Sequence, residues 1–399
     1  MTARILIIAG SDSGGGAGIQ ADIKTVTMLG GHAMTAVTAI TAQNTCGVSA
    51  VHRIPTEMVI AQIDAVVGDI GVDAVKIGMI GSAATAHAVA DYLENFRSSR
   101  AKSRDSGVGV SRLRSTQADI QIPIIFDPVM VATSGATLAD ADTIAAFERL
   151  MAIATLTTPN LPELEALGGE RALFGPTLIK GGHGDGAMIT DRLVDTNGEI
   201  ACWSDARIAT SSTHGTGCTL ASAIACLLGQ GIALKAAITQ ARQFVRLALR
   251  AAPGLGAGHG PMGHGSVRAD AIGAAPLLNQ ITLGSSDYAA SVAFYQALGL
   301  RQIVDSPANF YARFESAGGT TLSLHADASI SGDTAIYFET TRLDVWVEEL
   351  IAAGLIFDQL PTGENWLWRE ARLRDPHGNR ICLYSAGENR RYPPWRIGE

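Results

Sequence analysis

The residues best suited to chemistry form the run Thr213–Thr219, THGTGCT, directly before the apolar segment Leu220–Leu228. Small residues in such a run let successive backbone N–H groups turn toward one point, and a helix that begins there adds the positive end of its dipole. This arrangement suits a phosphoryl group in a highly charged transition state. Cys218 falls in the predicted first turn, where the pKa of a thiol is lowered and its thiolate is accessible. A glycine-rich loop with a buried structural cysteine is the alternative interpretation.

Polar residues also follow several apolar runs that are typical of strands. They are Asp127, Asn160, Glu163 and Lys180. Carboxylate and amide oxygens are the ligands that Mg²⁺ prefers, and an ammonium group suits phosphate oxygens. In an open parallel sheet the carboxyl ends of the strands meet at one edge, where ligands bind. Together with the THGTGCT run, these residues indicate phosphoryl transfer.

A further set of residues suits a pocket for a small ring. The run Gly10–Gly18, GSDSGGGAG, lacks the last glycine of a dinucleotide fingerprint and the Gly-Lys-Ser/Thr of a Walker loop, but its glycines allow a ligand close to the backbone. Asp22 could bond a ring amine or a hydroxyl, Gln43 offers both a donor and an acceptor, and Met79 offers a soft apolar contact. Each residue taken alone is more readily structural than functional, and Asp22 could be an exposed residue of the first helix.

Short β-rich runs alternate with helical patterns up to about residue 250, which predicts an α/β fold with a doubly wound, mainly parallel sheet. The expected strands are Arg4–Ala9, Ala74–Ile77, Ile122–Phe126, Ala154–Thr157, Thr177–Lys180 and Ala187–Thr190, with a β-rich run at Thr35–Asn44. The expected helices are Pro55–Val67, Ala83–Phe96, Ala139–Met151 and Pro162–Leu167. The Ser- and Arg-rich stretch Arg97–Asp119 interrupts this pattern and is predicted to be a solvated, mobile insertion, with a basic interaction patch as the alternative.

The chain changes character after Pro253. The stretch Pro253–Pro276 is rich in glycine and alanine, which predicts the end of a domain followed by a linker. From Asn279 to Tyr384 the pattern predicts a smaller α+β domain in which the order βαβββ occurs twice.

Length and composition limit the class of protein. A chain of 399 residues predicts two or three domains. The formal charge of −8 argues against a nucleic-acid partner, and no apolar run approaches the roughly 20 residues that a membrane helix requires. Five scattered cysteines and a start without signal-peptide features lead us to expect a cytoplasmic protein.

Several segments, in this order along the chain, carry a resemblance to a known family. They are IAGSDSGGGAGIQADIKT, TAITAQNT, IGMIGS, DPVMVATSG, TPNLPELE, KGGH and THGTGCTLASAIA. They resemble the bacterial hydroxymethylpyrimidine/phosphomethylpyrimidine kinases of thiamin biosynthesis, in the ribokinase-like superfamily. The resemblance implies a kinase domain over residues 1–265 and a linker over 266–277. It also implies ATP- and Mg²⁺-dependent phosphorylation of 4-amino-5-hydroxymethyl-2-methylpyrimidine, and then of its monophosphate to the diphosphate.

The resemblance also assigns roles to residues of this sequence. For the pyrimidine pocket it implies Gly10, Asp22, Gln43 and Met79; for Mg²⁺ and the phosphates it implies Asp127, Asn160 and Glu163. The implied catalytic residues are Lys180, which neutralises developing charge, and Cys218, which accepts or orients the substrate's hydroxyl proton, beside an anion hole of Gly215, Thr216 and Gly217. Thr133 departs from the family pattern, which often has a lysine there.

Residues 278–399 resemble the glyoxalase/bleomycin-resistance/dioxygenase group, through ITLGSSD, AFYQALGL and the run Asp375–Asn379. Enzymes of that group hold a divalent metal with four side chains, and the corresponding positions here are Gln280, Ser323, Ala335 and Cys382. Alanine cannot coordinate a metal, so we expect a metal-free binding or stabilising module. The alternative is an active metal-dependent lyase or dioxygenase.

Two further alternatives concern the whole chain. The first is another vitamin kinase, acting on pyridoxal, and the second is a ligand-binding or regulatory protein whose kinase portion has decayed. For the kinase interpretation we expect a small-molecule pyrimidine substrate and a homodimer.

Overall fold

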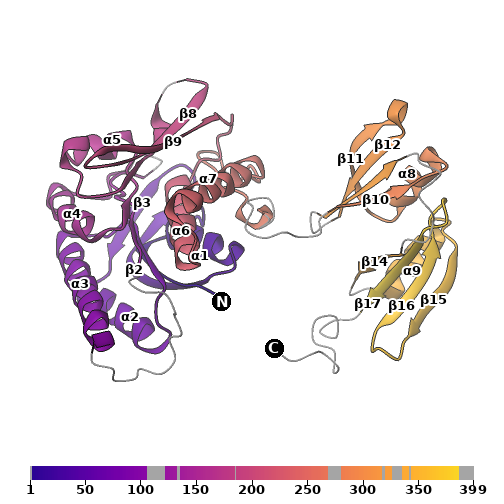
Figure 1. Cartoon of the computed structure of the whole chain (residues 1–399), viewed down its shortest axis with the longest axis horizontal. Coiled ribbons are helices and arrows are strands. Elements are labelled where there is room, and N and C mark those ends of the chain that lie inside the picture. The colour runs from indigo at the N-terminus through magenta and orange to yellow at the C-terminus, as the bar shows by residue number, and fades with distance from the viewer. Residues whose placement is uncertain are drawn as a thin grey trace. The chain divides into compact units, whose positions relative to one another are not determined.

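The chain divides into two compact units, Met1–Ala275 and Pro276–Glu399. The computed structural model describes residues 2–105, 122–132, 135–184, 186–267, 280–316, 320–325, 335–340 and 343–385; for residues 99–105, 183, 280 and 309 it describes only the backbone. Figure 1 shows the elements of both units.

The described part of the first unit contains a nine-stranded sheet in the order β3-β2-β1-β4-β5-β6-β7-β8-β9. Its strands are β1 (Arg4–Asp12), β2 (His32–Gln43), β3 (Val48–Arg53), β4 (Ala74–Ile77), β5 (Ile124–Phe126), β6 (Leu156–Thr157), β7 (Thr177–Ile179), β8 (Met188–Asp195) and β9 (Gly198–Ala206). The six strands from β2 to β7 in that order run parallel, while β3, β8 and β9 pair in the antiparallel sense at the edges. The predicted doubly wound, mainly parallel sheet is confirmed.

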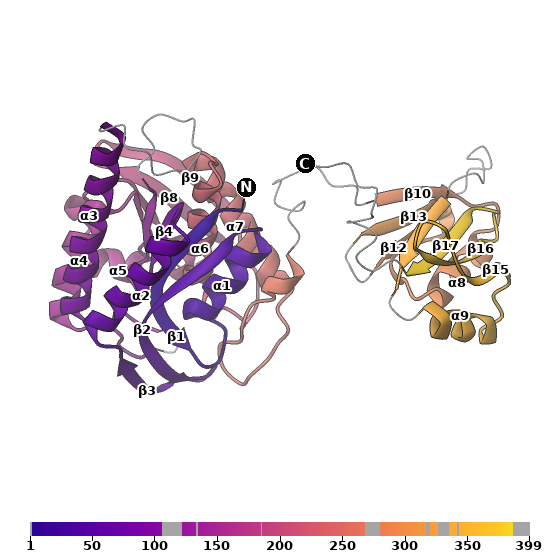
Figure 2. The ribbon, with the colours of Figure 1, turned by 90° about the horizontal axis from the view of Figure 1, so that it is seen from below.

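Helices cover both faces of this sheet (Figures 1 and 2). They are α1 (Gly18–Met28), α2 (Thr56–Asp69), α3 (Ala83–Asp105), α4 (Ala141–Ile153), α5 (Leu161–Ala166), α6 (Thr216–Gly229) and α7 (Leu234–Arg250). Strand β1 shows why there are two layers, because successive side chains of a strand point to opposite faces. Ile5 and Ile7 pack into the core that α1, α6 and α7 cover, while Leu6 and Ile8 pack into the core beneath α2, α3 and α4.

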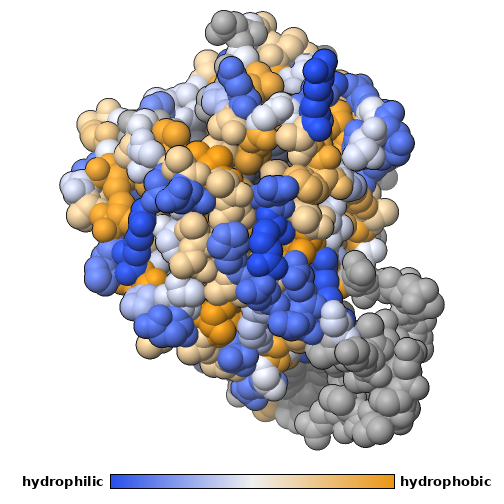
Figure 3. Space-filling view, turned by 90° about the vertical axis from the view of Figure 1, so that its left-hand side faces the viewer, coloured by the Kyte–Doolittle hydropathy of each residue, from blue (hydrophilic) through white to orange (hydrophobic). Residues whose placement is uncertain are grey.

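The outer surface of the first unit mixes side-chain types. Figure 3 shows the face at the left of Figure 1, where hydrophobic side chains are dispersed among hydrophilic ones. Such a face is ordinary for helices that bury one side and expose the other.

The predicted strands and helices are confirmed, apart from differences at their ends, and the strand predicted at Ala187–Thr190 extends to Asp195 as β8. The larger difference is at Arg97, which was expected to begin a solvated insertion but lies within α3. Its guanidinium group is half-buried and donates hydrogen bonds to the carbonyl oxygens of Ile153 (2.7 Å) and Ile122 (2.8 Å). Arg97 therefore anchors the helix to the body of the unit. Residues 106–121 of the expected insertion, and Thr133, lie outside the described residues.

The described part of the second unit consists of two similar modules, so the predicted repeat of βαβββ is confirmed. The first comprises β10 (Gln280–Gly284), α8 (Tyr288–Ala297), β11 (Arg301–Ser306), β12 (Tyr311–Glu315) and β13 (Thr321–His325). The second comprises β14 (Ala335–Glu339), α9 (Leu343–Ala352), β15 (Phe357–Gly363), β16 (Arg369–Arg374) and β17 (Arg380–Ser385). Their sheets have the matching orders β10-β13-β12-β11 and β14-β17-β16-β15, and side chains of both modules share one core. No helix among the described residues of either unit is long and apolar enough to cross a membrane.

Candidate active site

A cavity of about 1010 Å³ lies at the carboxyl ends of the parallel strands of the first unit. Residues at or just after the ends of β1, β2, β4, β5, β6 and β7 line it, because parallel strands deliver the residues that follow them to one edge. Every site residue predicted from the sequence lines this cavity except Asp22.

The THGTGCT run begins helix α6 in the way its composition predicts. Gly215 precedes the helix with φ of 80° in the left-handed region, and Thr216, Gly217 and Cys218 form the first turn. The Thr216 N–H makes a long hydrogen bond of 3.4 Å to the Thr213 carbonyl oxygen. The first-turn amides that follow it, of Gly217 and Cys218, have no preceding turn to bond, so the start of α6 offers donors to an anion. A Cβ atom at Gly215 would collide with the carbonyl oxygen of Gly16. Only glycine allows the two loops to approach so closely.

A lysine between two carboxylates lies beside this turn. The Lys180 ammonium is 2.7 Å from Asp127 Oδ1 and 3.8 Å from Glu163 Oε2. Thr158 also donates a hydrogen bond to Asp127 Oδ1, at 2.9 Å. A Cβ atom at Gly217 would lie 3.2 Å from Lys180 Nζ and 3.5 Å from Asp127 Oδ2, so the cluster faces the amides of α6.

The electrostatics keep this lysine and Asp127 charged. Burial alone would raise the pKa of Asp127, but Lys180 and the nearby Lys76 outweigh burial and hold that pKa below its ordinary value. Burial alone would lower the pKa of Lys180, yet the Asp127 and Glu163 carboxylates raise it. Burial raises the pKa of Glu163, which lies farther from the ammonium.

Asn160 positions Glu163 through a capping box at the start of α5. The Asn160 side-chain oxygen accepts a hydrogen bond from the Glu163 backbone N–H (2.9 Å), and Glu163 Oε2 accepts one from the Asn160 N–H (2.8 Å). The carboxylate of Glu163 is thereby held beside Lys180.

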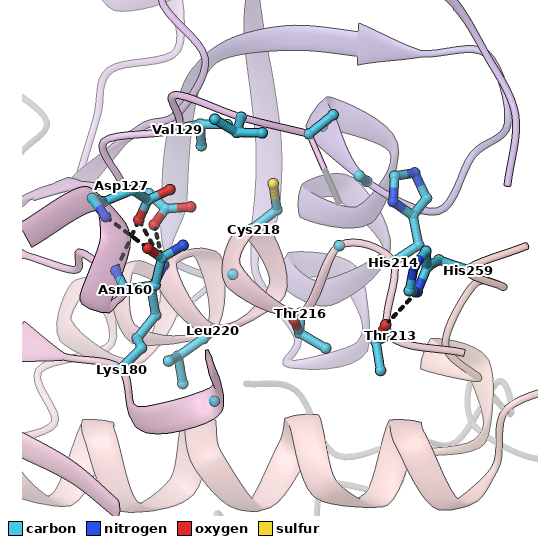
Figure 4. A pocket seen from close by; sticks show the side chains of 18 of the residues that line it. Asp127, Val129, Asn160, Lys180, Thr213, His214, Thr216, Cys218, Leu220 and His259 are labelled. Atoms are coloured by element: carbon cyan, nitrogen blue, oxygen red, sulfur yellow. Dashed lines mark hydrogen bonds and ion pairs between the residues drawn. The ribbon is translucent and has the colours of Figure 1, made fainter. Parts of the chain in front are cut away.

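Cys218 lies between the two ends of the cavity. Figure 4 shows its thiol between the cluster of Asp127, Asn160 and Lys180 on one side and His214 on the other. The expectation of a lowered thiol pKa is wrong, because burial and the carboxylates of Asp22 and Asp127 raise the pKa of Cys218 to about 11.

Asp22 does not line the cavity, which corrects both interpretations made for it. Its side chain is fully buried beneath the site, where Lys76 Nζ lies 2.8 Å from Oδ2 and Ser222 donates to Oδ1 at 2.6 Å. Neither exposure on the helix nor contact with a ligand fits this position. A lysine buried among nonpolar strand residues requires a carboxylate partner, and Asp22 is that partner.

At the other end of the cavity, Gly10 and Met79 lie close together, since a Cβ atom at Gly10 would lie 2.9 Å from Met79 Sδ. Gln43 also lines the cavity there. Its Nε2 lies 3.2 Å from Nε2 of His214.

Sequence reasoning missed several residues that shape this site. Lys76 lies in strand β4, AVKI, where a single charge in a buried strand was the available signal. Asp12 and His214 form an ion pair or hydrogen bond of 2.9 Å, although 202 positions separate them. Arg242 of α7 pairs with Asp191 (2.7 Å), whose other oxygen accepts the Gly181 N–H next to Lys180. No local pattern signals these two long-range pairs.

The fold and the site define a small-molecule kinase of the ribokinase-like class: a doubly wound sheet with an anion-binding helix start and a lysine–carboxylate cluster at its strand ends. The sequence model of the phosphomethylpyrimidine kinase family matches residues 12–101 and 110–263. The chain belongs to this family. Residues 277–383 match the glyoxalase/bleomycin resistance protein/dioxygenase superfamily.

Relatives with curated names agree with this placement. The chain is 42% identical over 285 residues to a hydroxymethylpyrimidine/phosphomethylpyrimidine kinase of Rhizobium meliloti, and the match covers 66% of this chain and 97% of that protein. It is 42% identical over 277 residues to the thiamine biosynthesis bifunctional protein ThiED of Geobacter sulfurreducens, a match that covers 65% of this chain. The match spans only about half, 52%, of that relative's length.

A solved structure also resembles the first unit. The pyridoxal kinase of Bacillus subtilis in complex with ADP superposes with a TM-score of 0.54 at 28% identity. The match covers 66% of this chain and 98% of that one.

In the second unit, two of the four positions expected to correspond to metal ligands have side chains with other partners. Ser323 Oγ lies 3.1 Å from the Tyr311 hydroxyl, and the Cys382 thiol donates to Glu370 at 3.5 Å. Burial and Glu370 raise the pKa of Cys382 to about 12. Ala335 lies in β14, and the Gln280 side chain lies outside the described residues. Among the residues that are described, no three His, Cys, Asp or Glu side chains form a metal-binding group.

Proposed function

We propose that the first unit transfers the γ-phosphoryl group of ATP to the hydroxymethyl group of 4-amino-5-hydroxymethyl-2-methylpyrimidine, and then to the resulting monophosphate. The observation that carries this proposal is one cavity with two different ends. Gln43 and Met79 suit a heteroaromatic ring, while the α6 amides, Lys180 and Asp127 suit phosphates. The relative from Rhizobium meliloti, whose length is almost fully matched, bears the name of this kinase.

Catalysis by these residues consists of positioning and charge stabilisation, as expected for phosphoryl transfer. The amides of Gly217 and Cys218 hold the transferring group, and Lys180 neutralises charge on its oxygens. Because both groups are fixed before the reaction, little reorganisation accompanies the transition state.

The cluster also fits Mg²⁺. The ion prefers few protein carboxylates together with phosphate oxygens and water, and Asp127 and Glu163 provide two carboxylates at the phosphate end of the cavity. Mg²⁺ bound there would shield the charge of the phosphates. Asn160 contributes by holding Glu163 in place.

Cys218 orients the substrate hydroxyl as a hydrogen-bond donor, and the hydroxyl proton passes to an oxygen of the transferred phosphoryl group. A thiol whose pKa is raised to about 11 is protonated at neutral pH, so it donates a hydrogen bond and cannot accept the hydroxyl proton. This proposal selects one of the two roles considered from the sequence.

Turnover of ATP with purified full-length protein tests the function. We expect ADP formation with the hydroxymethylpyrimidine, and in a second reaction with its monophosphate, both lost on removal of Mg²⁺ by EDTA. K180A should lower kcat by at least about hundredfold, because the phosphoryl group loses its positive partner. Absence of turnover with both pyrimidines would reject the function.

A pyridoxal kinase is the second candidate, favoured by the structural similarity to the Bacillus subtilis enzyme. An assay with both compounds present separates the two candidates, because the ratio of the two phosphorylated products reports the ratio of their kcat/KM values. We expect the aminopyrimidine to exceed pyridoxal.

For the second unit we propose a metal-free binding or stabilising module rather than a metal-dependent lyase or dioxygenase. Support comes from Ala335, which has no donor atom, and from the Cys382 thiol, which is engaged with Glu370. Elemental analysis of protein purified without chelators tests this, and stoichiometric Ni²⁺ or Zn²⁺ would contradict it. We further propose that the protein is a cytoplasmic homodimer, which cell fractionation and sedimentation equilibrium would check.

A further inference from the structure

Asp12 joins two loops that meet at the cavity. Its carboxylate accepts hydrogen bonds from the backbone N–H groups of Gly14 (2.8 Å), Gly16 (2.9 Å) and Ala17 (2.8 Å) in the glycine-rich loop after β1. The same oxygen that accepts from Gly16 and Ala17 lies 2.9 Å from Nε2 of His214, in the loop before α6. Asp12 and His214 are both buried.

This geometry determines which atom carries a proton. Burial would raise the pKa of Asp12, but His214 and the loop amides hold that pKa below its ordinary value, so Asp12 is a carboxylate and only accepts. His214 Nε2 therefore carries the hydrogen and donates it to Asp12. This holds whether the ring is neutral or protonated at its other nitrogen.

The proton on His214 in turn sets the orientation of the Gln43 carboxamide. A carboxamide NH₂ group cannot bond to a ring nitrogen that is itself a donor, although Gln43 Nε2 and His214 Nε2 are 3.2 Å apart. A half-turn of the carboxamide exchanges its oxygen and nitrogen, which have nearly the same size and shape. The oxygen then faces His214 Nε2–H and shares this hydrogen with Asp12 as the longer arm of a three-centre hydrogen bond, 3.2 Å against 2.9 Å.

The hydroxyl of Thr41 agrees with this orientation. Thr41 Oγ1 lies 2.8 Å from the carbonyl oxygen of Ser11 and 3.1 Å from the other terminal atom of the Gln43 carboxamide. A hydroxyl has one proton, and the Ser11 carbonyl can only accept it. The second partner of Thr41 must therefore be a donor, which is the NH₂ group of Gln43 after the half-turn.

We propose that the Asp12–His214 pair acts as a positioning and specificity device: it fixes the Gln43 carboxamide with its oxygen toward His214, and so selects the hydrogen-bonding edge of the ring that the site accepts. This inference rests on the proposed function, because it concerns the pyrimidine of that reaction. One N–H and one lone pair of the fixed carboxamide remain for the ligand. They match the amine and the adjacent ring nitrogen of a 4-aminopyrimidine. In the corresponding 4-oxo ring, donor and acceptor are exchanged.

The experiment compares the 4-amino substrate with its 4-oxo analogue, in the full-length protein and in two variants. In H214A the carboxamide can adopt both orientations. We expect the ratio of kcat/KM for the 4-amino over the 4-oxo compound to fall at least about tenfold, because a site with a fixed donor pattern rejects the mismatched ring. The KM for ATP should change little.

D12N is the matched control. Its carboxamide oxygen is expected to face Gly16 and Ala17, since the NH₂ group there would oppose two N–H donors. The NH₂ group then faces the Gly14 N–H, so D12N gives up that one loop hydrogen bond and keeps an acceptor for His214. The oxygen then still accepts from His214, so D12N should keep the ratio within about threefold of wild type while removing the negative charge. Nitrogen NMR of His214, assigned through its backbone, should show a protonated Nε2 in the wild type.

The outcomes separate the two proposals. An equal loss of kcat/KM for both compounds in H214A, or an Nε2 without a proton, would overturn the specificity device. A wild-type enzyme that phosphorylates neither compound would reject the proposed function. The device would then be judged by the same NMR spectrum, which requires neither turnover nor a variant.

Discussion

Buried charges beneath the cavity act on one another more strongly than water acts on them. Burial alone would lower the pKa of Lys76, but the carboxylates of Asp22 and Asp127 raise that pKa above its ordinary value. The ammonium group therefore stays charged in the interior. The same carboxylates also raise the pKa of the Cys218 thiol. For the lysine the raised pKa preserves a charge, whereas for the thiol it prevents one.

Alkylation of Cys218 tests its protonation state. A pKa raised to about 11 leaves roughly one thiol in a thousand ionised at pH 8. In a background that replaces the exposed Cys46 and Cys202 by serine, the rate of iodoacetamide labelling at Cys218 should rise about tenfold per pH unit from pH 7 to 10. Mass spectrometry of the labelled peptide measures this rate. A labelling rate that reaches a plateau below pH 8 would show that Cys218 is already a thiolate there.

Removing Lys76 tests the buried pair. K76M leaves the Asp22 carboxylate buried without its cation, which should lower the free energy of unfolding by about 3–5 kcal/mol. The double variant D22N/K76M removes both charges and keeps an acceptor for Ser222, so its loss should be smaller than that of K76M. Urea unfolding measures both, and a larger loss in the double variant would contradict the pairing.

At the scale of elements, the start of α6 depends on contact between backbones. Gly215 lies against the Gly16 carbonyl, so the loop after β1 and the loop before α6 support each other. The position of the α6 amides therefore depends on the loop after β1, which lies near the other end of the first unit's sequence.

Substitution of Gly215 tests this contact. G215A should lower kcat/KM by at least about hundredfold, because the added methyl group displaces the amides of α6. The control is G231A, at a position with φ of 86° and open space around the Cβ atom. It should cost about 1–2 kcal/mol of stability from backbone strain alone and leave activity unchanged. Similar activity in both variants would show that the close approach is unimportant.

At the scale of the whole molecule, the two units have separate hydrophobic cores. The cores of the first unit draw on residues up to Val267, and that of the second begins at Leu283. Because each unit buries its own nonpolar side chains, each is expected to fold by itself.

Truncation tests this independence. A protein of residues 1–275 should be folded by circular dichroism and keep kcat/KM for the pyrimidine within about threefold of the full-length value. An insoluble or inactive truncated protein would show that the second unit stabilises or completes the first.

Local patterns were sufficient for most of the fold. The strands β1 and β4 and the helices α2 and α4 could be predicted because their nonpolar periodicity depends on neighbours in the sequence. The residues that follow the strands could be placed at one edge of the sheet, because the carboxyl ends of parallel strands meet there. The extension of α3 past Arg97 was missed, since the carbonyl groups that hold Arg97 belong to distant segments.

The sequence by itself determined the alternation of strands and helices, the family resemblance and the residues at the strand ends. These follow from local spacing and from the order of motifs. Only the tertiary structure decided that Asp22 is buried against Lys76, that the Cys218 thiol is protonated and that His214 meets Asp12. Burial and Coulomb interactions depend on distances between groups far apart in the chain, and folding alone sets those distances.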